Sequence, residues 1–143
     1  MKTDKIHFTK LVKVNAPVDI AYQIENIANG KKSRRALLNR SVSALFDDTH
    51  RGKACTYNIG GNVSYIFSGS ESQEYQKIYE ELIENLCSIN KNSLTKKEQE
   101  EQKEEYKALH REKVMDLINS CSSCKTVDPI YKGDKLISLD YYA

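Results

Sequence analysis

Apolar and polar residues alternate at the start of the chain. Between residues 5 and 14, apolar side chains recur on one face with the two-residue period of a strand. A helix is predicted next, because Pro17 suits a first helical turn and Gly30 suits the position just after a helix. Its apolar residues are Val18, Ile20, Ala21, Ile24 and Ile27.

A second, shorter element follows this helix. Ser33 can cap an element that starts at Arg34 and continues to about Leu38. For residues 40–46 the pattern fits a helix and a strand equally, because the apolar residues there match both periods. Residues 47–52 are predicted to form a loop.

The clearest strand signal comes after this loop. Two β-rich runs, residues 53–59 and 62–68, flank the pair Gly60-Gly61. A glycine pair between such runs predicts a β-hairpin.

Two helices are predicted after the hairpin. Ser70 with Gln73, and Thr95 with Glu98, each match a capping box. The first helix carries an apolar stripe, and the second runs to about Ser120, so the two are expected to form a long antiparallel hairpin. The stripe comprises Tyr75, Ile78, Tyr79, Leu82, Ile83, Leu86 and Ile89.

The C-terminal part is predicted to contain turns and one strand. Asp128-Pro129 and residues 132–134 match turns, and residues 136–142 match a strand. Together the elements predict an α+β fold with a small, mostly antiparallel sheet packed with helices. The 143 residues suit a single domain, 1–143.

Composition places limits on location. No apolar run approaches the ~20 residues of a membrane span. The N-terminus has no continuous apolar segment of a secretory signal, so we expect a cytoplasmic protein, in the host cell if the source is viral. In that compartment the four cysteines stay reduced.

Charge is distributed unevenly. Residues 31–53 contain seven cations and two carboxylates, whereas residues 71–105 contain ten Glu and five Lys. Such polarity is typical of an anion-binding surface, although two solvated faces of opposite sign explain it equally well. The candidate phosphate ligands are the arginines Arg34, Arg35, Arg40 and Arg51 of the basic segment, with Arg111 on the second long helix.

The turn Ser68-Gly-Ser-Glu-Ser72 raises the question of a phosphate site. A helix N-terminus offers free N–H groups to an anion. However, the turn lacks the Gly-Lys-Ser/Thr ending of a phosphate-binding loop, and Glu71 and Glu74 would repel an anion. Simple helix capping is the favoured interpretation.

Aromatic residues offer a second kind of contact. Tyr57, Tyr65 and Phe67 lie on the predicted β-hairpin, close in sequence to the basic segment. They could stack on a nucleotide base, and Tyr65 and Phe67 are the candidates. Packing in the core is the more common role of such residues.

No catalytic or metal site is predicted. Cys121 and Cys124 have CxxC spacing, but they follow a helix C-terminus and lack two further zinc ligands. The three histidines match no metal-ligand spacing. We therefore expect a protein that is not an enzyme and that needs no cofactor or metal.

The layout resembles the phage Thoeris anti-defence 1 family, sponges that capture immune signals of the cyclic ADP-ribose type. The resemblance rests on size, layout and the runs LVKVNAPVDIAYQIENIANGKKSRRALLNRSVSALFDD and RGKACTYNIGGNVSYIFSG. It implies sequestration of an intact nucleotide by a homodimer or larger homo-oligomer, counteracting host antiviral signalling. The two amphipathic helices could supply the dimer interface.

Two alternative functions use the same residues. A regulator that binds nucleic acid or protein could use the basic face of residues 31–53, and binding to nucleic acid would weaken steeply with salt. An enzyme acting on nucleotides would convert its ligand.

Overall fold

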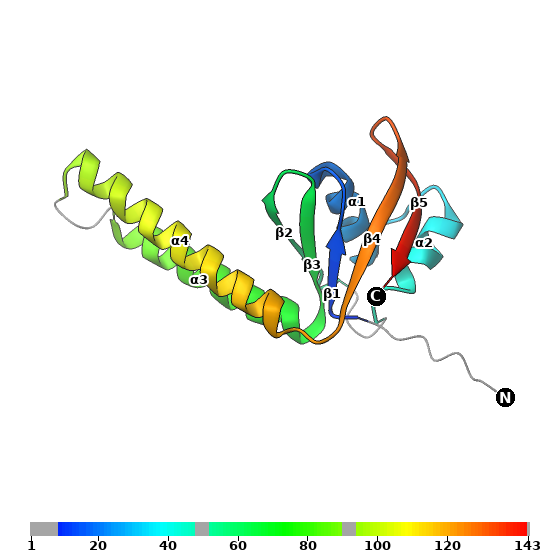
Figure 1. Ribbon diagram of the computed structural model, residues 1–143, viewed down its shortest axis with the longest axis horizontal. Coiled ribbons are helices and arrows are strands. Elements are labelled where there is room, and N and C mark those ends of the chain that lie inside the picture. The colour runs from blue at the N-terminus through cyan, green and yellow to red at the C-terminus, as the bar shows by residue number, and fades with distance from the viewer. Residues whose placement is uncertain (1–8, 48–51, 90–93, 143) are drawn as a thin grey trace. The chain divides into compact units, whose positions relative to one another are not determined.

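The computed structural model describes residues 9–47, 52–89 and 94–142. The chain forms two compact units (Figure 1). The sheet unit extends to Ser72 and resumes at Cys121, and the helical unit comprises Gln73–Ser120. That the chain is a single domain stays a prediction.

The sheet unit contains a five-stranded sheet and two helices. The strand order is β2-β3-β1-β4-β5; β1 and β4 are parallel, and the other neighbours are antiparallel. The predicted α+β class with a mostly antiparallel sheet is confirmed. The strands are β1 Leu11–Val14, β2 Cys55–Gly60, β3 Val63–Phe67, β4 Cys124–Lys132 and β5 Lys135–Tyr142; the helices are α1 Val18–Ala28 and α2 Ala36–Ser43.

The core of this unit lies between one sheet face and the helices α1 and α2. Val12 pairs with Ile66 across β1 and β3, and both side chains are fully buried. Successive residues of a strand point to opposite faces, so one alternating set from each strand meets the helices. The helices contribute Ile20, Ala21, Ile24, Ala28, Leu38 and Val42.

Helix α1 ends as its sequence predicts. Gly30 has φ 87°, a conformation that disfavours residues with a Cβ. Its N–H donates to the Ile27 carbonyl at 3.0 Å, and the Lys31 N–H donates to the Asn26 carbonyl at 2.9 Å. This pair of bonds is the Schellman motif, which stops the helix and fixes the direction of the next segment.

The second helix corrects one prediction and resolves another. Ser33 is not the helix cap, because Arg35 occupies that position; the Ser33 Oγ instead accepts a hydrogen bond from the Arg35 N–H, before the helix starts. Residues up to Ser43 are helical, which settles the ambiguous segment 40–46 as helix followed by a turn.

The prediction of a turn at Asp128-Pro129 is wrong, because both residues lie within β4. The Val127 carbonyl accepts a hydrogen bond from the Asn15 N–H, so it points toward the β1 side of β4. Residue 129 lies two positions further along the strand, so its backbone groups point toward this same side. Pairing with β1 ends at Val127. The N–H that proline lacks is therefore not needed there.

The two hairpins of the sheet unit match their turn signals. β2 and β3 pair antiparallel, with a bulge between Asn58 and Gly60 that moves the turn one residue along, to Gly61-Asn62. The Gly133-Asp134 turn joins β4 to β5, so the predicted turn at residues 132–134 and the last strand are confirmed.

The helical unit is an antiparallel pair of long helices. α3 spans Gly69–Ile89 and begins in the sheet unit, and α4 spans Lys96–Ser120 (Figure 1). The Thr95–Glu98 capping box is confirmed, since the Thr95 Oγ1 accepts from the Glu98 N–H at 3.2 Å. The Ser70–Gln73 box is wrong, because α3 begins one residue before Ser70 and places it in the first turn.

Candidate functional site

The strongest candidate site is a hollow of about 320 Å³ in the sheet unit. It lies between α1, the segment that joins α1 to α2, and the start of β5. Every charged side chain that lines it within residues 9–47, 52–89 and 94–142 is a cation. We call it the cationic pocket; its cations are Lys31, Lys32, Arg34, Arg35 and Lys135.

The end of α1 positions the segment that carries four of these cations. The Schellman bonds at Gly30 direct the chain out of the helix just before Lys31. Asn29 then anchors this corner, because its amide exchanges two hydrogen bonds with the Ala54 backbone, at 2.8 and 3.0 Å. The corner is thereby attached to the segment that leads into β2.

The fifth cation comes from a distant part of the sequence. The Gln23 Nε2 donates to the Asp134 carbonyl at 2.6 Å, and its Oε1 accepts from the Leu136 N–H at 3.4 Å. These bonds hold the start of β5 against α1 and place Lys135 at the pocket. Sequence reasoning missed Lys135, because no local pattern relates it to residues 31–35.

The pocket combines its charged rim with an apolar interior. Leu38 and Leu136 are buried and line it together with Ile27, which is partly buried. Binding pockets of proteins commonly have this make-up, with a mostly apolar wall and a few polar groups that fix orientation. Its volume lies at the lower end of the ~300–1,000 Å³ usual for such sites.

A smaller hollow of about 120 Å³ shares Ile27, Lys31 and Lys32 with the pocket and is also lined by Asn39. The Asn39 Oδ1 is buried and has no hydrogen-bond partner within the described residues. A buried acceptor without a partner costs free energy. A hydroxyl or N–H of a bound molecule could satisfy it.

The cations of the pocket are exposed and close together. Within the described residues, none of Lys31, Lys32, Arg34, Arg35 and Lys135 forms an ion pair. Like charges gathered in this way repel one another, so an anion that neutralises them is favoured. Two of the five are arginines, whose planar guanidinium groups can bind a phosphate through two parallel hydrogen bonds.

The structure brings only some of the predicted phosphate ligands together. Arg34 and Arg35 line the cationic pocket. Arg40 lies on α2 and is exposed but does not line it. Arg51 lies outside the described residues, and Arg111 belongs to α4 in the helical unit.

The two predicted stacking residues lie on the other face of the sheet. Ile66 points toward the helices α1 and α2, so its neighbours Tyr65 and Phe67 point away from them. Phe67 is only 1% exposed and packs as an interior residue. Tyr65 is partly buried opposite Tyr57, and desolvation, with a smaller effect of Cys124, raises the pKa of its hydroxyl.

The serines of the turn at residues 68–72 are buried or contact other side chains of the protein. The Ser70 Oγ accepts from Lys10 Nζ at 2.9 Å, and Ser68 and Ser72 are buried. The Ser72 Oγ lies 3.3 Å from Cys55 Sγ. These contacts support a structural role for the turn at the start of α3 and leave the cationic pocket as the better phosphate candidate.

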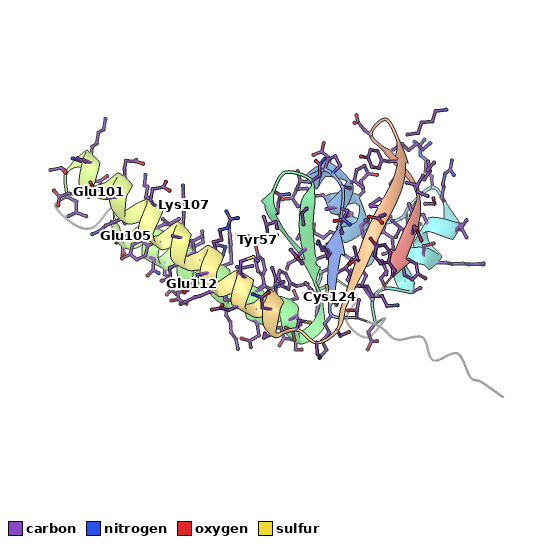
Figure 2. The ribbon with its side chains drawn as sticks, in the orientation of Figure 1. Tyr57, Glu101, Glu105, Lys107, Glu112 and Cys124 are labelled. Atoms are coloured by element: carbon purple, nitrogen blue, oxygen red, sulfur yellow. The ribbon has the colours of Figure 1, made fainter. Side chains whose placement is uncertain are left out.

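Of the CxxC pair, Cys124 has the features of an unreactive thiol. Cys121 follows the last residue of α4. Cys124, which Figure 2 labels, begins β4. Desolvation, together with the nearby Cys121, raises the pKa of the Cys124 thiol, which disfavours the reactive thiolate. Across residues 9–47, 52–89 and 94–142, no three His, Cys, Asp or Glu side chains gather in a way that could hold a metal ion.

Comparison with protein families, with curated proteins and with solved structures gives no match to this chain. The resemblance to the Thoeris anti-defence 1 family therefore stays a prediction. None of the helices in the described ranges has the length and apolar character needed to cross a membrane.

Proposed function

We propose that the chain binds a phosphate-bearing small molecule in the cationic pocket and holds it without converting it. One observation carries the proposal: five cations and, among the described residues, no carboxylate line a hollow of about 320 Å³ with apolar residues in its wall. Charge selects an anion, and the concave shape favours a small molecule over an extended surface.

The pocket also limits the kind of contact that the ligand makes. No aromatic ring of the part of the chain that the structure describes lines it, and Tyr65 lies on the opposite sheet face. Recognition would rest on the phosphate groups, with Arg34 and Arg35 as bidentate donors and the lysines as additional charges. A ligand with two linked phosphates would engage more of the five cations than a single phosphate would.

Nucleotide signals of the cyclic ADP-ribose type are the first ligands to test. They carry a pyrophosphate, and the resemblance of the sequence to anti-defence sponges points to the same class. In this proposal the protein acts by sequestration, lowering the free concentration of the signal and so counteracting host antiviral signalling.

A nucleic-acid-binding regulator is the second candidate. It is supported by Arg40 and Lys53, which are exposed cations of the basic segment that do not line the pocket. The two functions differ in their response to salt, because nucleic acid releases several counterions on binding and a small ligand releases few. A steep loss of affinity with salt would favour nucleic acid.

Native mass spectrometry of the protein purified from its source cells tests the proposal. The wild type should carry an additional mass that heat releases as an intact phosphorylated compound. The variant Arg34→Gln/Arg35→Gln should lose that mass, whereas Arg40→Gln, which removes a charge outside the pocket, should retain it. A wild type that stays unoccupied after incubation with cyclic ADP-ribose, ADP and pyrophosphate would overturn the proposal.

A further inference from the structure

Ser33 places a hydroxyl group among the cations of the cationic pocket. It is the one hydroxyl-bearing side chain among the described residues that line the pocket. Two lysines precede it in the sequence and two arginines follow it, and all four of these cations line the same hollow. A phosphoryl group attached to the Ser33 Oγ would therefore bring into the pocket the kind of anion that the pocket favours.

The segment that carries Ser33 is open to another protein. Residues 31–35 belong to no helix or strand, and the four cations in this segment are exposed, whereas Ser33 itself is partly buried. The Arg35 N–H donates to the Ser33 Oγ at 3.1 Å. Within the described ranges, the backbone of residues 32–34 forms no hydrogen bond. An enzyme that binds its substrate as an extended segment would thus disrupt few interactions here.

The start of α2 lacks the negative charge that a helix N-terminus favours. Its N-cap residue, Arg35, makes no side-chain cap hydrogen bond, and the first turn contains no acidic residue. The first N–H groups of a helix have no partner within the helix and attract anions. Arg34 and Arg35 place charges of the unfavourable sign beside them. A phosphate on Ser33, two residues before the N-cap, would supply the missing negative charge.

We propose that Ser33 is a phosphorylation site and that its modification closes the cationic pocket to the ligand. This inference rests on the proposed function, because it assigns a regulation to the same pocket. The enzyme is a protein kinase that selects serines flanked by basic residues, and ATP is the phosphoryl donor. The Ser33 Oγ attacks the γ-phosphorus of ATP, the bond from this phosphorus to the ADP oxygen breaks, and the hydroxyl proton passes to a base of the kinase.

The added group resembles the ligand that it would exclude. A phosphoserine carries a charge of about −1.5 to −2 at pH 7 and three acceptor oxygens. Because it is attached to the chain, it competes for Arg34 and Arg35 at a high effective concentration. Its charge also repels a second phosphate. Phosphorylation should therefore weaken ligand binding and, at the same time, stabilise the start of α2.

Treatment of the folded full chain with ATP and a kinase of this specificity tests whether the site can be modified. Mass spectrometry of the proteolytic peptides should locate a phosphate on Ser33. The Ser33→Ala variant is the control for this assignment, because its peptide should gain no phosphate at position 33. A folded wild type that takes up no phosphate at Ser33 would overturn the inference.

Phosphoserine introduced during translation tests the consequence of the modification. Ser33→phosphoserine should raise the melting temperature without ligand by ~2–4 °C and should weaken pyrophosphate binding at least ~10-fold. Ser122→phosphoserine is the matched control, because Ser122 is exposed and does not line the pocket, and it should change neither quantity.

The two measurements separate this inference from the proposed function. An unchanged melting temperature or an unchanged affinity of the Ser33→phosphoserine protein would overturn the inference. If the unmodified wild type binds neither pyrophosphate nor a nucleotide, the proposed function fails. The melting temperature then still decides whether a phosphate on Ser33 is held by the cations and by the start of α2.

Discussion

At the scale of single residues, side-chain amides attach the elements of the sheet unit to one another. Asn29 connects the end of α1 to Ala54, and Gln23 connects α1 to the β4–β5 turn. Both residues bind backbone groups more than 20 positions away in sequence. They hold the corner and the strand that supply the cations of the pocket.

Replacing Asn29 tests this role. Asn29→Ala leaves the N–H and the carbonyl of the buried Ala54 without their partner, which should lower the free energy of unfolding by ~2 kcal/mol. Urea denaturation followed by circular dichroism measures the change. Asn62→Ala, at an exposed turn position, is the control and should change stability little. Equal stability of the two variants would contradict the role of Asn29.

The environment of His110 predicts that the stability of the helical unit depends on pH. Its ring lies 6.4 Å from Tyr75 and 6.2 Å from Tyr79, and desolvation lowers its pKa below 6.5, partly opposed by the Ile78 carbonyl. A lowered pKa in the folded state means that folding favours the neutral ring. The contribution to stability is therefore complete above pH 6.5 and is lost as the pH falls below this value.

The measurement is the melting temperature between pH 7.5 and 5. As the pH decreases, the melting temperature should fall more steeply for the wild type than for His110→Gln, because glutamine is not protonated in this range. Because the other two histidines are present in both proteins, the difference isolates His110. Parallel pH profiles for the two proteins would contradict this assignment.

At the scale of elements, the sequence signals that depend only on neighbouring residues predict where helices and strands begin and end. The capping box at Thr95, the glycine that ends α1 and the glycine pair at the end of β2 each depend on neighbouring residues alone, and each marks the predicted boundary to within a residue. The prediction of a turn at Asp128-Pro129 is wrong because of strand pairing, which cannot be read from the sequence. At this point of β4 the N–H that proline lacks has no pairing partner and is not needed. The Ser70 box failed because α3 starts earlier.

The capping box gives a prediction for α4. Thr95 Oγ1 accepts from the Glu98 N–H at 3.2 Å, so Thr95→Ala leaves a helix N–H without its cap. The substitution should cost ~1 kcal/mol of stability. Ser122→Ala, at an exposed position outside the helix, is the control. Urea denaturation that shows the same midpoint for both variants would argue against the cap.

At the scale of the whole molecule, the predicted phosphate ligands include two of the five cations of the candidate site. Arg34 and Arg35 could be identified because the basic segment is continuous in sequence. Lys135 could not be, because only the folding of β5 against α1 brings it there. The sequence places Tyr65 and Phe67 close to the basic segment, yet strand alternation directs them to the opposite sheet face from α1 and α2.

The central claim is that the cationic pocket binds a phosphorylated ligand, and calorimetric titration with pyrophosphate and with cyclic ADP-ribose tests it most directly. The wild type should bind at least one of them. Arg34→Gln/Arg35→Gln should bind at least ~100-fold more weakly, because it removes two charge-assisted contacts, while Arg40→Gln should bind like the wild type. Equal affinities for the wild type and the double variant, or no binding by the wild type, would contradict the account.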